Sequence, residues 1–429
     1  MKRLIVSLLL TMLPLAAQTS SLQGVVTDAQ GAVVPAAAIT VTNTETNTPR
    51  SSLTDESGKY SLLQMPPGSY KMQVQAPGFS VFSSEIRLQI NTPTTLNVKL
   101  ELGQTTETVN VTAEAVAINT QDATVGNPFT ELQIKAIPLQ TRNVVELLSV
   151  QPGVSSTGQV LGARPDQNNV VLDGADVNDN QGADGFKAVL PIPLDSVQEF
   201  RTTIAGQGAD LGHSAGGQVS IVTKGGSNAF HGSLYEYNRN TLFEANDWFN
   251  NRAGVARPAL VRNQYGGSIG GPILKNRLFF FYNWDQNPSL QKERVIATLP
   301  TLQERNGDFS NSRTPAGALI TVRDPSTGLP FPNNIVPANR INTQGQRLLG
   351  VFTPPNALDR NITTGAYNND VLAINAFKRL QHIYRVDFRP NDKDTINCRG
   401  TYFVTSNDAE MARNQPATGI GWNFSEQTF

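Results

Sequence analysis

The chain has 429 residues, a formal net charge of −1, and 16% charged and 39% apolar residues. This length predicts about two to four domains. The nearly balanced charge argues against a nucleic-acid-binding protein, which needs a basic face. After the N-terminus no apolar run reaches the roughly 18 residues of a spanning helix, so a membrane role has to rest on β-strands.

Residues 1–17 have the pattern of a secretory signal peptide. Lys2 and Arg3 precede the apolar run Leu4–Leu15, and small residues at Ala16 and Ala17 follow it. The alternative is a buried N-terminal helix. The chain has one cysteine, which lies far from this segment, so neither a lipoprotein anchor nor an intrachain disulfide is expected.

Residues 20–102 read as short alternating strands separated by turns at intervals of about 8–12 residues, which is typical of a small antiparallel sandwich. Five short motifs in this order resemble the carboxypeptidase regulatory-like domain: Gly24–Asp28, Val34–Ala37, Thr54–Tyr60, Pro67–Tyr70 and Pro77–Phe79. The resemblance implies a transthyretin-like β-sandwich without catalytic groups. Some domains of this fold bind carbohydrate, but no row of Trp residues marks a sugar site here.

A polar linker, Gly103–Thr106, leads into a short segment of alternating β-forming residues. The segment consists of Glu107, Thr108, Val109, Asn110, Val111, Thr112 and Ala113. Between a sandwich and a globular segment it resembles the TonB box of an outer-membrane receptor. That resemblance implies that its backbone pairs with an exposed strand edge of TonB. The alternative interpretation is an ordinary strand.

Residues 118–228 resemble the plug domain of TonB-dependent receptors, especially the Oar-like group. The motifs that support this resemblance are Asn168–Asp179, Ile192–Arg201 and Gly216–Gly226. Before them, Phe129–Leu139 and Arg142–Val150 have helical apolar spacing. The sequence therefore predicts an α+β domain.

No metal, cofactor or catalytic site is expected. Asp176, Asn178 and Asn180 have an EF-hand spacing, but Gln181 and Lys187 stand where an EF-hand needs Gly and Glu. A looser calcium site stays possible, and turn-shaping Asx residues are the preferred explanation. The glycines of residues 266–271 lack the Lys and the helix of a phosphate loop. The histidines lack paired-ligand spacing.

Residues 229–429 contain five strands with the character of an outer-membrane barrel: 231–239, 261–269, 277–284, 379–389 and 395–404. Alternate residues of the third strand, from Leu278 to Trp284, form an apolar face that suits lipid. Tyr384, Val386 and Phe388 alternate with Arg385, Asp387 and Arg389, and Ile396, Cys398, Tyr402 and Val404 alternate with Asn397, Arg399 and Thr401. A half-buried soluble sheet is the alternative.

A polar stretch at about 287–377 shows no clear strand and is expected to be a long extracellular loop. Five strands are fewer than the roughly eight of the smallest single-chain barrels. The sequence is therefore expected to be an N-terminal fragment of a longer receptor, with the first strands of an incomplete antiparallel transmembrane β-barrel.

The expected protein is mainly β and is a bacterial outer-membrane TonB-dependent receptor. Its expected partners are TonB with its inner-membrane energising complex, outer-membrane lipid, and an extracellular small-molecule or oligomeric ligand. The ligand class, siderophore, oligosaccharide or peptide, stays open. The alternative is a secreted or surface carbohydrate-binding adhesion protein, which would have no need of the plug-like segment. No enzymatic activity is expected.

Overall fold

The computed structural model describes residues 19–103, 108–111, 123–139, 142–179, 188–189, 192–207, 214–252, 254–391, 394–409 and 422–424. The predicted signal peptide lies outside them. The chain forms two compact units, one of residues 1–233, 267–283 and 383–401 and one of residues 234–266, 284–382 and 402–429. In the described part of the chain, no helix is long and apolar enough to cross a membrane.

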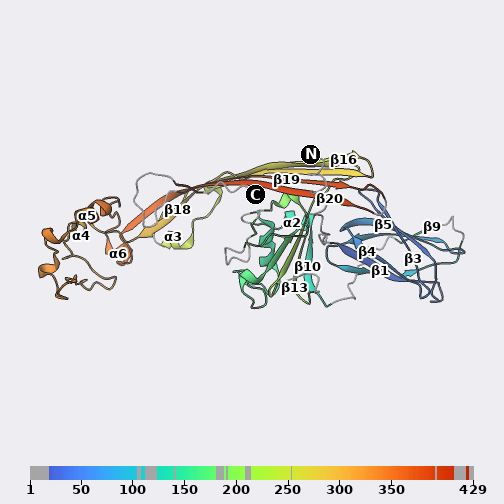
Figure 1. The fold of residues 1–429 in the computed structure, drawn as a ribbon, viewed down its shortest axis with the longest axis horizontal. Helices are drawn as coiled ribbons and strands as arrows, with labels where there is room; N and C mark the ends of the chain where they lie inside the picture. The colour runs from blue at the N-terminus through green and yellow to red at the C-terminus, as the bar shows by residue number, and fades with distance from the viewer. Residues whose placement is uncertain are drawn as a thin grey trace, which may run out of the picture. The chain divides into compact units, whose positions relative to one another are not determined.

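The first unit begins with two β-sheets that form the expected sandwich (Figure 1). Its strands are β1 Ser20–Thr27, β2 Ala38–Asn43, β3 Pro49–Leu53, β4 Lys59–Met65, β5 Gly68–Gln75, β6 Val81–Leu88, β7 Pro93–Thr95, β8 Val98–Lys99 and β9 Thr108–Val111. One sheet has the order β4-β1-β7 with β8 also beside β1, and the other has the order β3-β2-β5-β6-β9.

The sandwich is not wholly antiparallel, in contrast to the prediction. β1 pairs in parallel with β7 and β8, and β6 pairs in parallel with β9. The reason is that the chain crosses from the second sheet to the first after β6, so that it meets β1 running in the same direction. Hairpin-like turn signals in the sequence do not report such a crossover.

Alternate residues along the strands are buried and together form the core of the sandwich, as the sequence pattern predicts. Tyr70, Met72 and Val74 of β5 are buried, while the residues between them are more exposed. The turns also follow the sequence. The Asp28 carboxylate accepts hydrogen bonds from the backbone N–H groups of Gln30 and Ala32 at 2.9 and 2.8 Å, which fixes the turn before β2.

A second sheet system with its own core follows in the same unit. Its elements are β10 Val125–Thr130, α2 Glu131–Ala136, the 3₁₀ helices η1 Val144–Val150, η2 Pro165–Gln167 and η3 Leu194–Ser196, and the strands β11 Asn169–Leu172, β12 Ala175–Asp176, β13 Val197–Ala205 and β14 Gln218–Thr223. The strand order is β10-β13-β14-β11-β12. Phe200, Leu147 and Ile221 are fully buried between the sheet and the helical segments.

The two helices predicted at 129–139 and 142–150 are only partly correct. The α-helix is limited to α2, and the second segment is the 3₁₀ helix η1. Phe129 belongs to β10, where it pairs with Phe200 and packs against it with ring centroids 5.9 Å apart. Thr130 then caps α2, because its backbone N–H donates to the Gln133 side chain at 2.9 Å. Strand pairing thus overrides the helical spacing at Phe129.

The long strands of the chain form one seven-stranded sheet. They are β15 His231–Asn240, β16 Leu260–Leu274, β17 Leu278–Gln286, β18 Ser289–Ala297, β19 Asn369–Phe388, β20 Ile396–Ala409 and β21 Trp422–Phe424, with η5 Thr241–Phe243 and α3 Trp248–Arg252 between β15 and β16. The order is β15-β16-β17-β19-β20-β21, and β18 pairs with β16 and β19. β19 has 20 residues and runs beside β20 (Figure 1).

The two faces of these strands differ as the sequence predicts. In β17, Phe279 and Phe281 are buried while Tyr282 is 37% exposed. In β19, Tyr384 and Val386 are exposed, and the intervening charged residues are more buried. In β19 an apolar exposed face thus lies opposite a polar, more buried one, which is the pattern of a strand between lipid and a wet interior. In β17 the buried face carries Phe279 and Phe281 as well as Asn283 and Asp285.

Within the second unit, four strands meet at one buried carboxylate. Asp285 of β17 is fully buried. It accepts hydrogen bonds from the Tyr235 hydroxyl of β15 at 3.0 Å and the Gln264 amide of β16 at 2.8 Å. Arg379 of β19 lies 3.2 Å away and balances the charge. A buried charge that is paired and hydrogen-bonded in this way avoids most of its desolvation penalty.

The polar stretch at 287–377 is not free of strands, which corrects the prediction at both of its ends. β18 occupies Ser289–Ala297 and β19 already begins at Asn369. The connection between them contains α4 Leu302–Arg305, η6 Pro332–Asn334, η7 Ala338–Arg340, α5 Thr343–Leu349 and α6 Arg360–Thr363. β18 was missed because its centre, Gln-Lys-Glu-Arg, has no apolar alternation.

This connection has its own hydrogen-bonded framework. Arg305 donates to the carbonyls of Phe352 and Thr353 at 2.8 and 2.6 Å. Arg340 donates to both carboxylate oxygens of Asp324 at 2.9 Å, and this pairing holds the pKa of Asp324 well below its usual range. The segment is therefore a folded lobe rather than a simple loop.

We expect Gly24→Val to destabilise the sandwich by several kcal/mol, on the order of a strong core mutation. A Cβ at Gly24 would lie 1.9 Å from the Leu96 carbonyl oxygen, a backbone atom that cannot turn aside. The thermal unfolding midpoint measures the effect. Gln23→Ala, at the neighbouring half-buried position, is the matched control and should change stability by less than about 0.5 kcal/mol. An unchanged midpoint in Gly24→Val would contradict this close packing.

Candidate functional site

The structure places part of the TonB-box-like segment on the sandwich. Thr108, Val109, Asn110 and Val111 form β9, the last strand of the sheet β3-β2-β5-β6-β9. They pair in parallel with β6, residue by residue, from Val81 opposite Thr108 to Ser84 opposite Val111. Glu107, Thr112 and Ala113 lie outside the described residues.

The chain just before this segment is tied to the start of β6. Leu102 forms an antiparallel bridge with Phe79. The backbone N–H of Ser80 donates to the carbonyl of Glu101 at 2.9 Å. The five residues 103–107 then separate Leu102 from β9. A short tether of this kind keeps the segment close to the β6 edge.

The sheet β10-β13-β14-β11-β12, which lies in the region predicted to be a plug, is called the plug sheet below. Polar contacts join the sandwich to this sheet at the loop after β6. The backbone N–H of Ile90 donates to the Glu199 carboxylate at 2.9 Å, and Arg201 donates to the Ile90 carbonyl at 3.2 Å. The Asn91 amide donates to the Ser220 hydroxyl at 3.0 Å. Glu199 and Arg201 are two residues apart on β13, so they share one face of the strand.

The carboxyl group of Glu199 is strongly perturbed. It is 2% exposed, and this burial raises its pKa to about 7. The Ile90 N–H and the positive charges of Arg87 and Arg201 oppose the shift without cancelling it. No sequence pattern had singled out Glu199 as a functional residue. The available signal was the Glu–Phe–Arg run, which puts two opposite charges on one face of an otherwise buried strand.

Two arginines of the long strands contact the plug sheet. Arg385 of β19 donates to the Thr223 carbonyl at 2.7 Å. Arg399 of β20 donates to the Asp173 carbonyl at 3.1 Å and lies 3.3 Å from the Asp173 carboxylate. Asp173 in turn accepts from the Thr223 backbone N–H at 2.9 Å. The polar face predicted for β19 and β20 thus supplies side chains that hold the end of β14.

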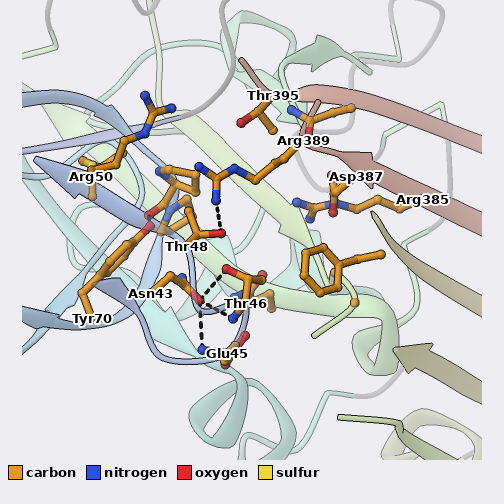
Figure 2. A pocket seen from close by; sticks show the side chains of 18 residues that line it. Asn43, Glu45, Thr46, Thr48, Arg50, Tyr70, Arg385, Asp387, Arg389 and Thr395 are labelled. Carbon is orange, nitrogen blue, oxygen red and sulfur yellow. Dashed lines mark hydrogen bonds and ion pairs between the residues drawn. The ribbon is translucent and has the colours of Figure 1, made fainter. Parts of the chain in front are cut away.

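A pocket lies beside these contacts, lined by the β2–β3 turn and the ends of β19 and β20 (Figure 2). Arg50, Arg385 and Arg389 contribute positive charge to it. Arg385 pairs with Asp387 at 2.7 Å, and Arg389 donates to the Thr48 hydroxyl. The Asn43 side chain accepts backbone N–H groups within the turn, as Figure 2 shows. Two of the three guanidinium groups are therefore engaged in contacts with other residues that line the pocket.

The Asx residues of the rejected EF-hand shape the local turn, as preferred from the sequence. The Asp176 carboxylate accepts from the Asn178 backbone N–H at 2.9 Å, and the Asn178 side chain accepts from the Val170 N–H at 2.7 Å. Asn180 lies outside the described residues. Among the residues that the structure describes, no group of three or more His, Cys, Asp or Glu side chains could hold a metal ion.

The glycines of β16 make room for aromatic side chains. A Cβ at Gly271 would lie 2.4 Å from the Phe230 ring, and one at Gly266 would lie 2.2 Å from the Trp284 carbonyl and 2.6 Å from the Tyr235 hydroxyl. Each glycine therefore allows a close approach to a neighbouring residue that a side chain would prevent. The rejection of a phosphate loop here agrees with their position in the middle of a strand.

Comparisons with known proteins agree with this architecture. Residues 21–101 match the carboxypeptidase regulatory-like domain, and residues 222–429 match the outer membrane beta barrel domain. The chain is 30% identical over 308 residues to the TonB-dependent transporter Oar of Myxococcus xanthus, which covers 67% of this chain and 28% of that protein. The chain thus spans less than a third of that relative's length.

Two solved receptors show a distant likeness. The siderophore receptor PirA from Acinetobacter baumannii matches 69% of this chain and 34% of its own chain, with 14% identity and a TM-score of 0.38. The outer membrane transporter YddB from Escherichia coli matches 66% of this chain and 33% of its own chain, with 13% identity and a TM-score of 0.40.

A sandwich, a plug sheet and strands with an apolar exposed face define an outer-membrane β-barrel protein of bacteria. Together with the similarity to Oar, they identify the group. The chain belongs to the TonB-dependent outer-membrane receptors and is Oar-like.

We expect stability to fall as pH rises through the range between the unfolded and folded pKa values of Glu199. Below about pH 4.5 the carboxyl is protonated in both states, and its contribution is fully present. Above about pH 7 the folded state bears a buried charge, which costs up to about 3 kcal/mol. Glu199→Gln keeps an acceptor for the Ile90 N–H and should remove this loss.

Thermal unfolding midpoints of both proteins between pH 4.5 and 8 measure the difference. Glu85→Gln, at an exposed position of β6, is the matched control and should follow the parent protein. Parallel pH profiles for the parent and Glu199→Gln would show that Glu199 titrates normally.

Proposed function

We propose that this protein is a receptor and transporter that takes up a ligand with energy delivered through TonB. The ligand is a siderophore, an oligosaccharide or a peptide, and no bond of the ligand is made or broken. The observation that carries this proposal is the order of parts along one chain. A sandwich and an extended segment precede a plug sheet, and strands with apolar exposed faces follow.

The partner in this proposal is TonB with its inner-membrane energising complex, bound through Glu107–Ala113 on the periplasmic side. Strand addition needs an extended backbone that can form main-chain hydrogen bonds with the edge strand of a sheet in the partner protein. The strand conformation of Thr108–Val111 supports this role, because these residues already pair with a sheet edge. Outer-membrane lipid surrounds the exposed faces of strands such as β17 and β19.

The plug sheet offers a path for a mechanical pull on this segment. β10 is the first strand that the structure describes after the segment, and it lies at the edge of the plug sheet. Its N-terminal residue, Val125, pairs with Ala205 at one end of the antiparallel β10–β13 ladder. A pull on the preceding chain therefore reaches one end of an edge strand. Such a strand peels off one hydrogen-bonded pair at a time, which needs less force than shearing all pairs together.

The folded lobe at residues 298–368 supports a role in ligand capture on the extracellular side. It exposes nine large apolar side chains: Leu302, Leu319, Ile320, Leu329, Ile335, Leu348, Val351, Leu358 and Ile362. The hydrogen-bonded framework around Arg305 and Arg340 holds the segment that presents these side chains to solvent. Their combination with arginines and asparagines suits a ligand with both apolar and polar groups.

We expect the double variant Val109→Pro, Val111→Pro to lose binding to the purified periplasmic domain of TonB by at least about tenfold. Proline removes the backbone N–H donors that strand addition uses. Val109→Thr, Val111→Thr retains both donors and the β-propensity, so it is the matched control and should bind like the parent. TonB binding by calorimetry and ligand uptake by cells measure the effect. Undiminished binding in the proline variant would refute the assignment of Glu107–Ala113.

We expect replacement of residues 298–368 by a two-residue Asn-Gly turn to abolish ligand binding to cells while leaving insertion intact. Ala297 and Asn369 are paired directly across β18 and β19, so a tight turn can close the ladder. Binding of a labelled panel of ferric siderophores, oligosaccharides and peptides gives the readout. Heat-modifiable migration of the outer-membrane protein checks insertion. Unchanged binding of a panel member that the parent captures would contradict the capture role.

A further inference from the structure

The segment proposed to contact TonB already has a strand partner within its own chain. β9 pairs in parallel with β6 over Thr108–Val111. The sheet order ends β5-β6-β9, so β6 would become the sheet edge if β9 left. The pairing therefore satisfies backbone groups of both strands, and a free β6 edge would leave a row of unpaired donors and acceptors.

The chain that precedes β9 is attached beside the start of β6, which keeps β9 close to its partner strand. The Phe79–Leu102 bridge and the Ser80–Glu101 hydrogen bond hold the chain beside the start of β6. Five residues, 103–107, separate Leu102 from Thr108. Short tethers give effective concentrations in the millimolar range, so even a four-residue ladder competes with a partner that arrives from solution.

Docking also fixes how the segment presents its backbone. In a paired strand every second residue directs its N–H and C=O groups to the partner. On β6, half of the backbone groups of Thr108–Val111 are committed, and the twist and register of the rest are set by the sandwich. A TonB strand that pairs with this segment in a different register can therefore bind only after the β6–β9 ladder has opened.

We propose that the β6 edge of the sandwich docks the TonB-contacting segment and that TonB binds it only after it leaves β6. This inference rests on the proposed function, because it takes Glu107–Ala113 as the TonB contact. The sandwich thereby sets the fraction of receptors that TonB can engage. The apparent affinity for TonB falls in proportion to the undocked fraction.

A disulfide across the ladder tests the proposal in the protein extracted from outer membranes. Ser83 and Asn110 are directly paired, and Ser83→Cys, Asn110→Cys in a Cys398→Ser background places two thiols opposite each other. Paired positions of neighbouring strands lie within the Cα separation that a disulfide spans. Binding to the purified periplasmic domain of TonB is measured for the oxidised protein and for the same protein after reduction.

We expect the oxidised protein to bind TonB at least tenfold more weakly than its reduced form, and the reduced form to match the Cys398→Ser parent. Thr40→Cys, Ser51→Cys in the same background joins β2 to β3 in the same sheet and leaves β9 free. This matched control should bind equally well in both redox states.

The outcomes separate the two ideas. If the oxidised protein binds TonB as tightly as the reduced protein, or more tightly, docking on β6 does not prevent TonB binding and the proposal is overturned. TonB would then pair with the open side of β9, and the assignment of Glu107–Ala113 as the TonB contact would stand. Failure of the two thiols to join under mild oxidation also overturns it, because the ladder would be absent. A synthetic peptide of residues 104–114 tests the assignment alone. If neither the peptide nor the reduced protein binds TonB, the proposed function itself fails.

Discussion

The structure depends on one constraint, which is that every backbone edge of a β-strand needs a partner. In lipid this requirement is severe, because no water is available to unpaired N–H and C=O groups. The strands β16, β17 and β19 accordingly lie between neighbours in one sheet, and β18 fills a position beside β16 and β19. β20 pairs with β19 on one side and meets β21 on the other at Asn407–Ala409. The same requirement acts on a small scale at β6, where a four-residue strand completes the sandwich sheet.

The second organising rule is that charge is buried only where it has partners. Asp285 has three side-chain partners on three other strands, and Asp173 has Arg399 and the Thr223 N–H. Asp285 and Arg399 lie on the faces of β17 and β20 opposite the exposed aromatic and aliphatic residues. The charged residues of the polar face also make contacts beyond their own strands, because Arg385 and Arg399 donate hydrogen bonds to carbonyl groups of the plug domain region.

The sequence predicted the features that depend on local period. The alternation in β17 and β19 and the Asp28 turn are readable from a few adjacent residues. β18 escaped prediction because its charged centre shows no alternation. Phe129 escaped because a long-range pair with Phe200 decided its conformation.

The features of the candidate site that escaped prediction depend on contacts between distant residues. Glu199 meets Ile90 across 109 positions of the chain, and no local pattern reports such a distance. The pairing of β9 with β6 is likewise parallel and non-local, so the alternation at Thr108–Val111 indicated a strand without indicating its partner. Alternation along a sequence therefore predicts that a segment is a strand, but the partner strand depends on the tertiary fold.

The length of β19 has a consequence for where the receptor meets its surroundings. Twenty residues at roughly 3.3 Å each make a strand of about 66 Å, whereas a tilted strand crosses the bilayer with about 9–11 residues. In the proposed orientation, about half of β19 is therefore surplus to the crossing and extends beyond the bilayer at the end where Asp370 pairs with Arg294 at 2.8 Å. In the proposed orientation, this paired ribbon would carry the lobe at 298–368 through the sugar layer of the cell surface. Antibodies, bacteriophages and proteases added to intact cells would reach that lobe first.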